Sequence, residues 1–238
     1  VHRGGMMNYL RLYANFLKNC FRRETLYRFN FWVSMFTVVL GYLSNVLFFD
    51  FIYGSGVEEI SGWGKYEVFI LLATVWIVDS IFGGMFFFNL IKIPMRVKNY
   101  DLDSVLIKPI NTIFILTLRQ FNFGLFAGVF FGVGLLIYSL YMGQFSLEIW
   151  NVFLYTVLII CSVVLLFSIL FIMVTFSLRF VRIQGLIQMF WSMMDIGTQP
   201  HAIYPMKLKF CFVFFVPAIV IYNFPMQILL NNNYITGL

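Results

Sequence analysis

Apolar runs of about 20 residues or more follow one another along most of this chain, separated by short polar segments. A helix needs about 20 apolar residues to cross the roughly 30 Å of hydrocarbon in a bilayer. Charged residues make up only 11% of the 238 residues, whereas about 25% is usual in a soluble domain. We therefore expect an all-α integral membrane protein with six transmembrane helices, at about residues 31–53, 66–91, 113–141, 150–178, 184–198 and 210–230.

The fifth of these segments is too short to cross a bilayer unaided, because its apolar run covers only residues 185–196. It is followed by Gly197, Pro200 and Pro205, which interrupt helices. Irregular backbone at membrane depth occurs only where it is buried in protein or lines a cavity. We expect either a short span or a re-entrant segment here, and a plain surface loop fits the residues equally well.

Residues 7–29 have a different pattern, with apolar side chains at helical spacing on one side and basic or amide side chains on the other. Basic amphipathic helices lie in the headgroup plane of a membrane. This pattern predicts an interfacial elbow helix that leads into the membrane domain, residues 30–231. An ordinary surface helix is the alternative.

The distribution of the 16 Lys and Arg residues predicts the orientation. Thirteen fall in the amino-terminal segment and in alternate connections, including the charged segment 92–111, and Lys65, Lys207 and Lys209 fall on the other side. Cytoplasmic loops carry the excess of positive charge, so we expect a cytoplasmic amino terminus. Because the basic residues flank apolar runs instead of forming one patch, the net charge of +6 does not indicate a nucleic-acid partner.

Three polar residues within the predicted spans are candidates for a translocation path: Asn45, Asp79 and Asp195. A carboxylate within a span is costly and often functional. Asp79 could line a polar path or could pair with Arg119 or Asn45, and for Asp195 we favour a structural role because the apolar run ends there. No further acid, His or Cys stands at ligand spacing, so the sequence predicts no metal or acid–base site.

Gly124, Gly128 and Gly132 recur every four residues in the predicted third span. Small residues at this spacing let a second helix approach closely. The contact is either within the chain or with another subunit, and we favour the first.

The sequence contains no glycine-rich phosphate loop followed by Lys and Ser or Thr, so it has no P-loop with which to hydrolyse ATP. Energy for active transport would have to come from another chain. The charged segment 92–111 is the largest internal polar connection, and apolar residues recur within it at roughly helical spacing. We expect a short helix there that contacts a partner.

The segment Asp101–Asn111, with its Asp-Leu-Asp, apolar residues and Lys-Pro-Ile-Asn, resembles a loop of the permease subunits of type-2 ABC exporters. Tyr204-Pro205, Val216-Pro217 and Asn223-Phe224-Pro225 resemble the Tyr-Pro and proline-containing final span of the small bacterial members, whose ATPase is encoded separately.

This resemblance implies a permease of the bacterial inner membrane that works as a dimer of identical or related chains. It also implies an ABC ATPase dimer that binds ATP and Mg and that contacts segment 92–111, with Arg96, Lys98, Asp101, Asp103, Leu106, Lys108 and Pro109 as the coupling residues. This chain itself would need no cofactor and would be no enzyme. The residues leave two other functions open, an integral-membrane enzyme that modifies lipid through Asp79 and a passive channel. The aromatic spans weakly favour an amphipathic or lipid-like substrate.

Overall fold

The computed structural model describes residues 4–26, 28–60, 62–100, 103–107, 110–180, 183–200, 205 and 217–230. These residues are mostly helical, with one short antiparallel hairpin formed by β1 (Glu59–Ile60) and β2 (Trp63–Gly64). Four helical stretches are long and apolar enough to cross a membrane: Phe31–Gly54, Lys65–Lys98, Phe123–Met142 and Ile149–Phe176. The chain is therefore an α-helical, multi-pass membrane protein.

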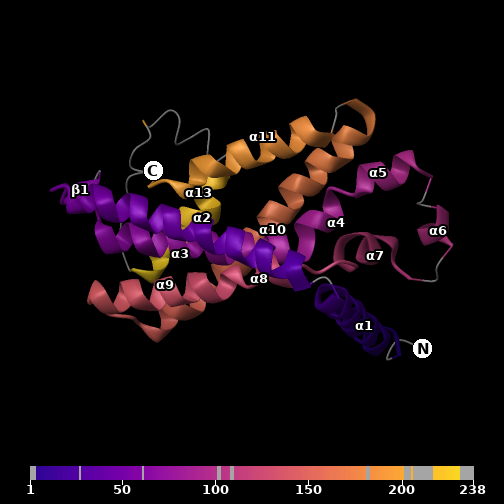
Figure 1. Ribbon diagram of the computed structural model, residues 1–238, viewed down its shortest axis with the longest axis horizontal. Helices are drawn as coiled ribbons and strands as arrows, with labels where there is room; N and C mark the ends of the chain where they lie inside the picture. Colours follow the sequence, from indigo (N-terminus) through magenta and orange to yellow (C-terminus); the bar gives the residue numbers. More distant parts are fainter. Residues whose placement is uncertain are drawn as a thin grey trace.

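The central helix is α3 (Lys65–Phe82), which is buried on nearly all sides. It packs against α2 (Arg28–Gly54), α9 (Gly128–Met142), α10 (Ile149–Phe180) and α13 (Ala218–Leu229). A helix that is apolar all round is stable only when other helices cover it on every side. Figure 1 shows α3 between these neighbours in the body of the molecule.

The long helices α2 and α10, which flank α3, expose much of their apolar surface. Along α2 many large apolar side chains are exposed, and a series of them recurs every three or four residues: Trp32, Phe36, Leu40, Leu43, Leu47 and Phe51. Such a stripe suits a helix that faces lipid or another apolar surface. The membrane domain therefore has a protein-packed centre at α3 and an apolar exterior.

The predicted third span, residues 113–141, is divided into three helices. These are α7 (Thr112–Leu118), α8 (Phe123–Phe126) and α9, and the chain leaves helical conformation at Gln120–Asn122. The break lies where Arg119, Gln120 and Asn122 interrupt the apolar run, so the part that can cross the membrane begins at Phe123.

The last two predicted spans are partly described. Helix α11 (Ile183–Asp195) leads into the short 3₁₀ helix η2 (Ile196–Thr198). Helix α13 begins after Pro217, and the preceding part of the predicted sixth span, residues 210–216, lies outside the described residues. Both α11 and α13 are shorter than a full span, so the described residues do not establish the predicted count of six.

Different elements lie at the two ends of the molecule. In Figure 1 the amino-terminal helix α1 (Gly4–Leu26), α5 (Ile93–Lys98) and α6 (Asp103–Leu106) lie at one end, and β1 lies at the other. Between α3 and α5 the helix continues through a π-helical turn, η1 (Gly83–Phe87), and the short α4 (Phe88–Leu90). The basic α1 and the charged segment after α4 therefore share one end.

Candidate functional site: the charged end and the membrane carboxylates

The described residues of the charged segment 92–111 include two short helices, α5 and α6. Helix α5 starts after Lys92 with Pro94 in its first turn, where the missing N–H of proline is harmless. It ends before Tyr100, whose positive φ of 58° turns the chain sharply. We call residues 93–100 and 103–107 the α5–α6 lobe, and Figure 1 shows α5 and α6 projecting at this end of the molecule beside α7.

The lobe is held to the body by a few buried apolar side chains. Ile93 and Pro94 are buried at the start of α5, which packs against α10. Val105 is buried in α6, which contacts α7. Hydrophobic contacts of this kind fix the inner side of the lobe and leave its outer side to the solvent.

The outer side of the lobe combines charge with exposed apolar groups. Met95, Tyr100, Leu106 and Ile107 are exposed, and Ile107 is 83% accessible. Of the predicted coupling residues, Lys98 is exposed, Arg96 is half-buried, and Asp103 opens α6. Asp101, Lys108 and Pro109 lie outside the described residues. Exposed apolar groups gathered at one polar end are typical of a surface that contacts another protein.

The break before α8 is stabilised by amide side chains that the sequence analysis did not select. Asn89 donates from Nδ2 to the carbonyl of Gln120 at 2.7 Å and accepts the Gln120 N–H at Oδ1 at 2.9 Å. The Asn122 N–H donates to the carbonyl of Gly84 within the π-helical turn, and its side chain caps α8 through the Leu125 N–H. Polar backbone leaving a helix at this depth must be satisfied by protein, and Asn89 does this.

Helix α1 lies along the segment from α7 to α8. The Asn111 N–H donates to the hydroxyl of Tyr9, and the rings of Tyr9 and Phe114 meet edge to face at 5.1 Å. Farther along α1, the Phe121 N–H donates to Cys20 Sγ, and the Phe123 N–H donates to Glu24 Oε1 at 3.1 Å. The α1 helix is thus bonded to the start of the third membrane segment.

The side chain of Asp79 accepts a hydrogen bond from a tyrosine. Tyr222 on α13 is fully buried and donates from its hydroxyl to Asp79 Oδ1 at 2.7 Å. Asp195 ends α11 directly before η2, which packs against both α3 and α13. Asn45 lies elsewhere, exposed on α2, and donates to the carbonyl of Gly41 in its own helix. The structure therefore brings Asp79 and Asp195 into one region and leaves Asn45 outside it.

We expect Tyr222→Phe to lower the free energy of unfolding by about 1–3 kcal/mol, because the variant leaves the Asp79 carboxylate without its donor. Thermal unfolding of the purified protein in detergent measures the effect. Tyr141→Phe is the matched control, since Tyr141 is exposed on α9. Equal melting temperatures for the two variants would show that the Tyr222 hydroxyl does not stabilise the fold.

The three spaced glycines lie at contacts within the chain. A methyl group at Gly128 would come within 2.2 Å of Ser80 Oγ, and one at Gly132 would come within 2.8 Å of Ile77 Cγ1, both on α3. A methyl group at Gly124 would meet Ser34 of α2 at 3.3 Å. In this chain the glycine series faces α3 and α2, as close helix packing through small residues requires.

The segment after α11 is closely packed on α13. A methyl group at Gly197 would lie 2.2 Å from the carbonyl oxygen of Ala218, so the two backbones are in contact. The buried Asn223 donates to the carbonyl of Gly197 at 2.9 Å. The irregular turn around Gly197 is therefore satisfied by protein groups, as irregular backbone within a membrane domain must be. His201 and Tyr204 lie outside the described residues.

A comparison with protein families identifies the class of the chain. The family model for the ABC-2 family transporter protein matches residues 39–237, which includes α3, the α5–α6 lobe and α13. The chain belongs to this ABC-2 transporter family. It is therefore a membrane protein of a transport family. No curated protein and no solved structure matches it.

Proposed function

We propose that this ABC-2 family chain is the permease subunit of an ATP-driven exporter in the bacterial inner membrane. Two such subunits, identical or related, form the substrate path, and a separate ABC ATPase dimer that holds ATP and Mg supplies the energy. The ATPase contacts the segment 92–111. The amino terminus and this segment are cytoplasmic.

The observation that carries the proposal is the exposed outer side of the α5–α6 lobe. Met95, Leu106 and Ile107 are apolar and exposed at a polar end of the molecule, beside the charged Lys98. An apolar patch rimmed by charge is typical of a protein interface. Because the inner side is anchored through Ile93, Pro94 and Val105, a force on the lobe would be transmitted to α7 and α10.

The location of the basic residues supports the orientation. The basic helix α1 lies at the same end as the lobe (Figure 1). The excess of Lys and Arg in the loops of a membrane protein faces the cytoplasm. ATP is available to a partner on that side. The lobe is then on the side where an ATPase could bind.

Isolation of the tagged chain from its native membrane in a mild detergent tests the proposal. We expect a P-loop ATPase to purify with it, and native mass spectrometry to give two permease subunits, identical or related, together with two ATPase subunits. Purification of the chain alone, together with ion conduction after reconstitution without ATP, would contradict the proposal and support a channel.

A further inference from the structure

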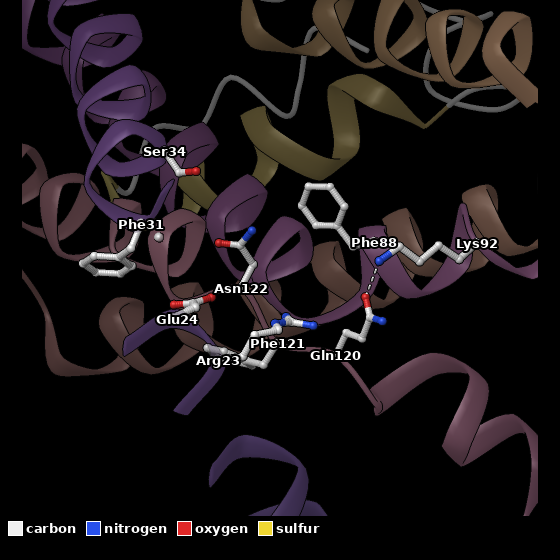
Figure 2. Close-up of a pocket in the computed structure, with 10 residues that line it drawn as sticks. Arg23, Glu24, Phe31, Ser34, Phe88, Lys92, Gln120, Phe121 and Asn122 are labelled. Atoms are coloured by element: carbon white, nitrogen blue, oxygen red, sulfur yellow. Dashed lines mark hydrogen bonds between the residues drawn. The ribbon is translucent and has the colours of Figure 1, made fainter. Parts of the chain in front are cut away.

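A polar cavity of about 290 Å³ opens where α1, α4 and the break before α8 meet, at the charged end of the molecule. Its lining includes Arg23, Glu24, Lys92, Gln120 and Asn122. Figure 2 shows Arg23 reaching into the space between Glu24 on one side and Lys92 with Gln120 on the other. Sites for small ligands have volumes of roughly 300–1,000 Å³, so the cavity suits a small polar group.

Two cations meet in this cavity. Arg23 and Lys92 both line it. Lys92 donates one hydrogen bond, to Gln120 Oε1, which leaves it further N–H groups (Figure 2). The Arg23 guanidinium donates no hydrogen bond to residues 4–26, 28–60, 62–100 or 110–180. Two neighbouring cations whose N–H groups are available for further hydrogen bonds are complementary to a phosphate.

Glu24 is the third charged side chain that lines the cavity, and its charge is negative. Its Oε1 accepts the Phe123 N–H, while its Oε2 is buried and accepts no hydrogen bond from the described residues. Burial raises the pKa of Glu24, although the Phe123 hydrogen bond and the charge of Arg23 act in the other direction. A buried carboxylate oxygen without a donor is costly. A ligand that brings a hydrogen-bond donor to Oε2 would remove that cost.

An apolar groove of about 400 Å³ adjoins the polar cavity and shares Glu24 and Phe31 with it. The groove is lined mainly by aromatic side chains, which include Phe21, Trp32, Phe123, Phe126 and Phe130. It lies at the start of α2 and of the span that begins at Phe123, which is where Trp and other amphipathic rings meet lipid headgroups. Free phosphate would fill the polar cavity alone, whereas a phospholipid would fill both spaces.

We propose that this composite cavity binds one phospholipid of the surrounding membrane. The lipid phosphate lies between Arg23 and Lys92, an ammonium or hydroxyl group of the headgroup donates to Glu24 Oε2, and an acyl chain follows the aromatic groove. Basic pockets between transmembrane helices on the cytoplasmic side bind lipid headgroups in this way. Because α1 and α8 both line the groove, the bound lipid would hold α1 against the membrane domain.

The test is lipid binding by the purified protein, followed by native mass spectrometry and thermal unfolding. The probes are dioleoyl phosphatidylethanolamine and phosphatidylglycerol, whose headgroups carry donors, phosphatidylcholine, which carries none, and inorganic phosphate. We expect the first two to bind and to raise the melting temperature more than phosphatidylcholine does, and inorganic phosphate to have little effect. Equal stabilisation by inorganic phosphate would overturn the lipid assignment, and equal binding of phosphatidylcholine would overturn the role of Glu24.

Two variants separate the headgroup contacts. Arg23→Gln with Lys92→Gln is expected to weaken lipid binding by about tenfold or more, because charge-assisted hydrogen bonds to the phosphate are lost. Glu24→Gln is expected to keep binding but to lose the preference over phosphatidylcholine. The matched control is Lys18→Gln with Arg22→Gln, which removes the same charge from two exposed positions of α1 that do not line the cavity. An equal loss of binding in that control would show general surface attraction instead of this site.

Discussion

Gly132→Leu is expected to separate α9 from α3 and to destabilise the protein by about 3 kcal/mol. A side chain at this position would begin 2.8 Å from Ile77 Cγ1 and 3.1 Å from the carbonyl oxygen of Ala73. The Ala73 contact is to backbone, so a change of rotamer cannot relieve it. Because α3 is the central helix, the displacement would disturb its packing with the rest of the membrane domain.

Gly134→Leu provides the control for this prediction. Gly134 is two residues away on the same helix, and a methyl group there would meet nothing within 4 Å. Leucine has a better helix propensity than glycine by about 1 kcal/mol, so this variant should be neutral or slightly stabilised. Thermal unfolding in detergent distinguishes the two. If both variants melt at the same temperature, α9 does not pack on α3 through Gly132.

The double variant Leu106→Asp with Ile107→Asp is expected to abolish ATP-driven transport while the protein still inserts and folds. Both side chains are exposed on the outer side of the α5–α6 lobe, so their replacement removes apolar contact area without opening the core. Losing well-buried anchors at an interface typically costs about 2 kcal/mol or more of binding free energy each. Co-purification of the ATPase with the variant measures the loss, and ATPase activity of the complex measures the coupling.

Val57→Asp is the control for the lobe variant. Val57 is also exposed and apolar, but it lies beside the hairpin at the other end of the molecule. It should leave the association with the ATPase unchanged. Equal loss of the ATPase from both variants would assign the effect to general damage, and retention of the ATPase by the lobe variant would remove the lobe from the interface.

The helical membrane architecture could be predicted because it follows from the length and composition of the apolar runs. The family could also be predicted, from short motifs such as Asp101–Asn111, and the family comparison agrees with it. The structure differs within residues 113–141, where a single transmembrane helix was predicted. Gln120 leaves the helix because Asn89, distant in sequence, supplies the hydrogen bonds that a helix would otherwise provide. The Asn122 N–H is satisfied by the carbonyl of Gly84 instead.

The polar contacts between helices could not be read from spacing along the chain. Asp79 could be selected as a costly carboxylate, but its partner Tyr222 is 143 residues away and looks like an ordinary aromatic residue in an apolar run. The same holds for Glu24 and Lys92, which share one cavity although they lie on α1 and before α5. Such pairs depend on how the helices pack, and one sequence does not carry that information.

Site-specific photo-crosslinking from Ile107 tests most directly whether the α5–α6 lobe receives an ATPase. Ile107 is 83% exposed, so a benzophenone side chain introduced there would project outward. In native membranes we predict a single major crosslink, to a chain that contains a P-loop, and none to that chain from the same group placed at Val57. Crosslinks to the ATPase from Val57 but not from Ile107 would contradict the proposed coupling surface.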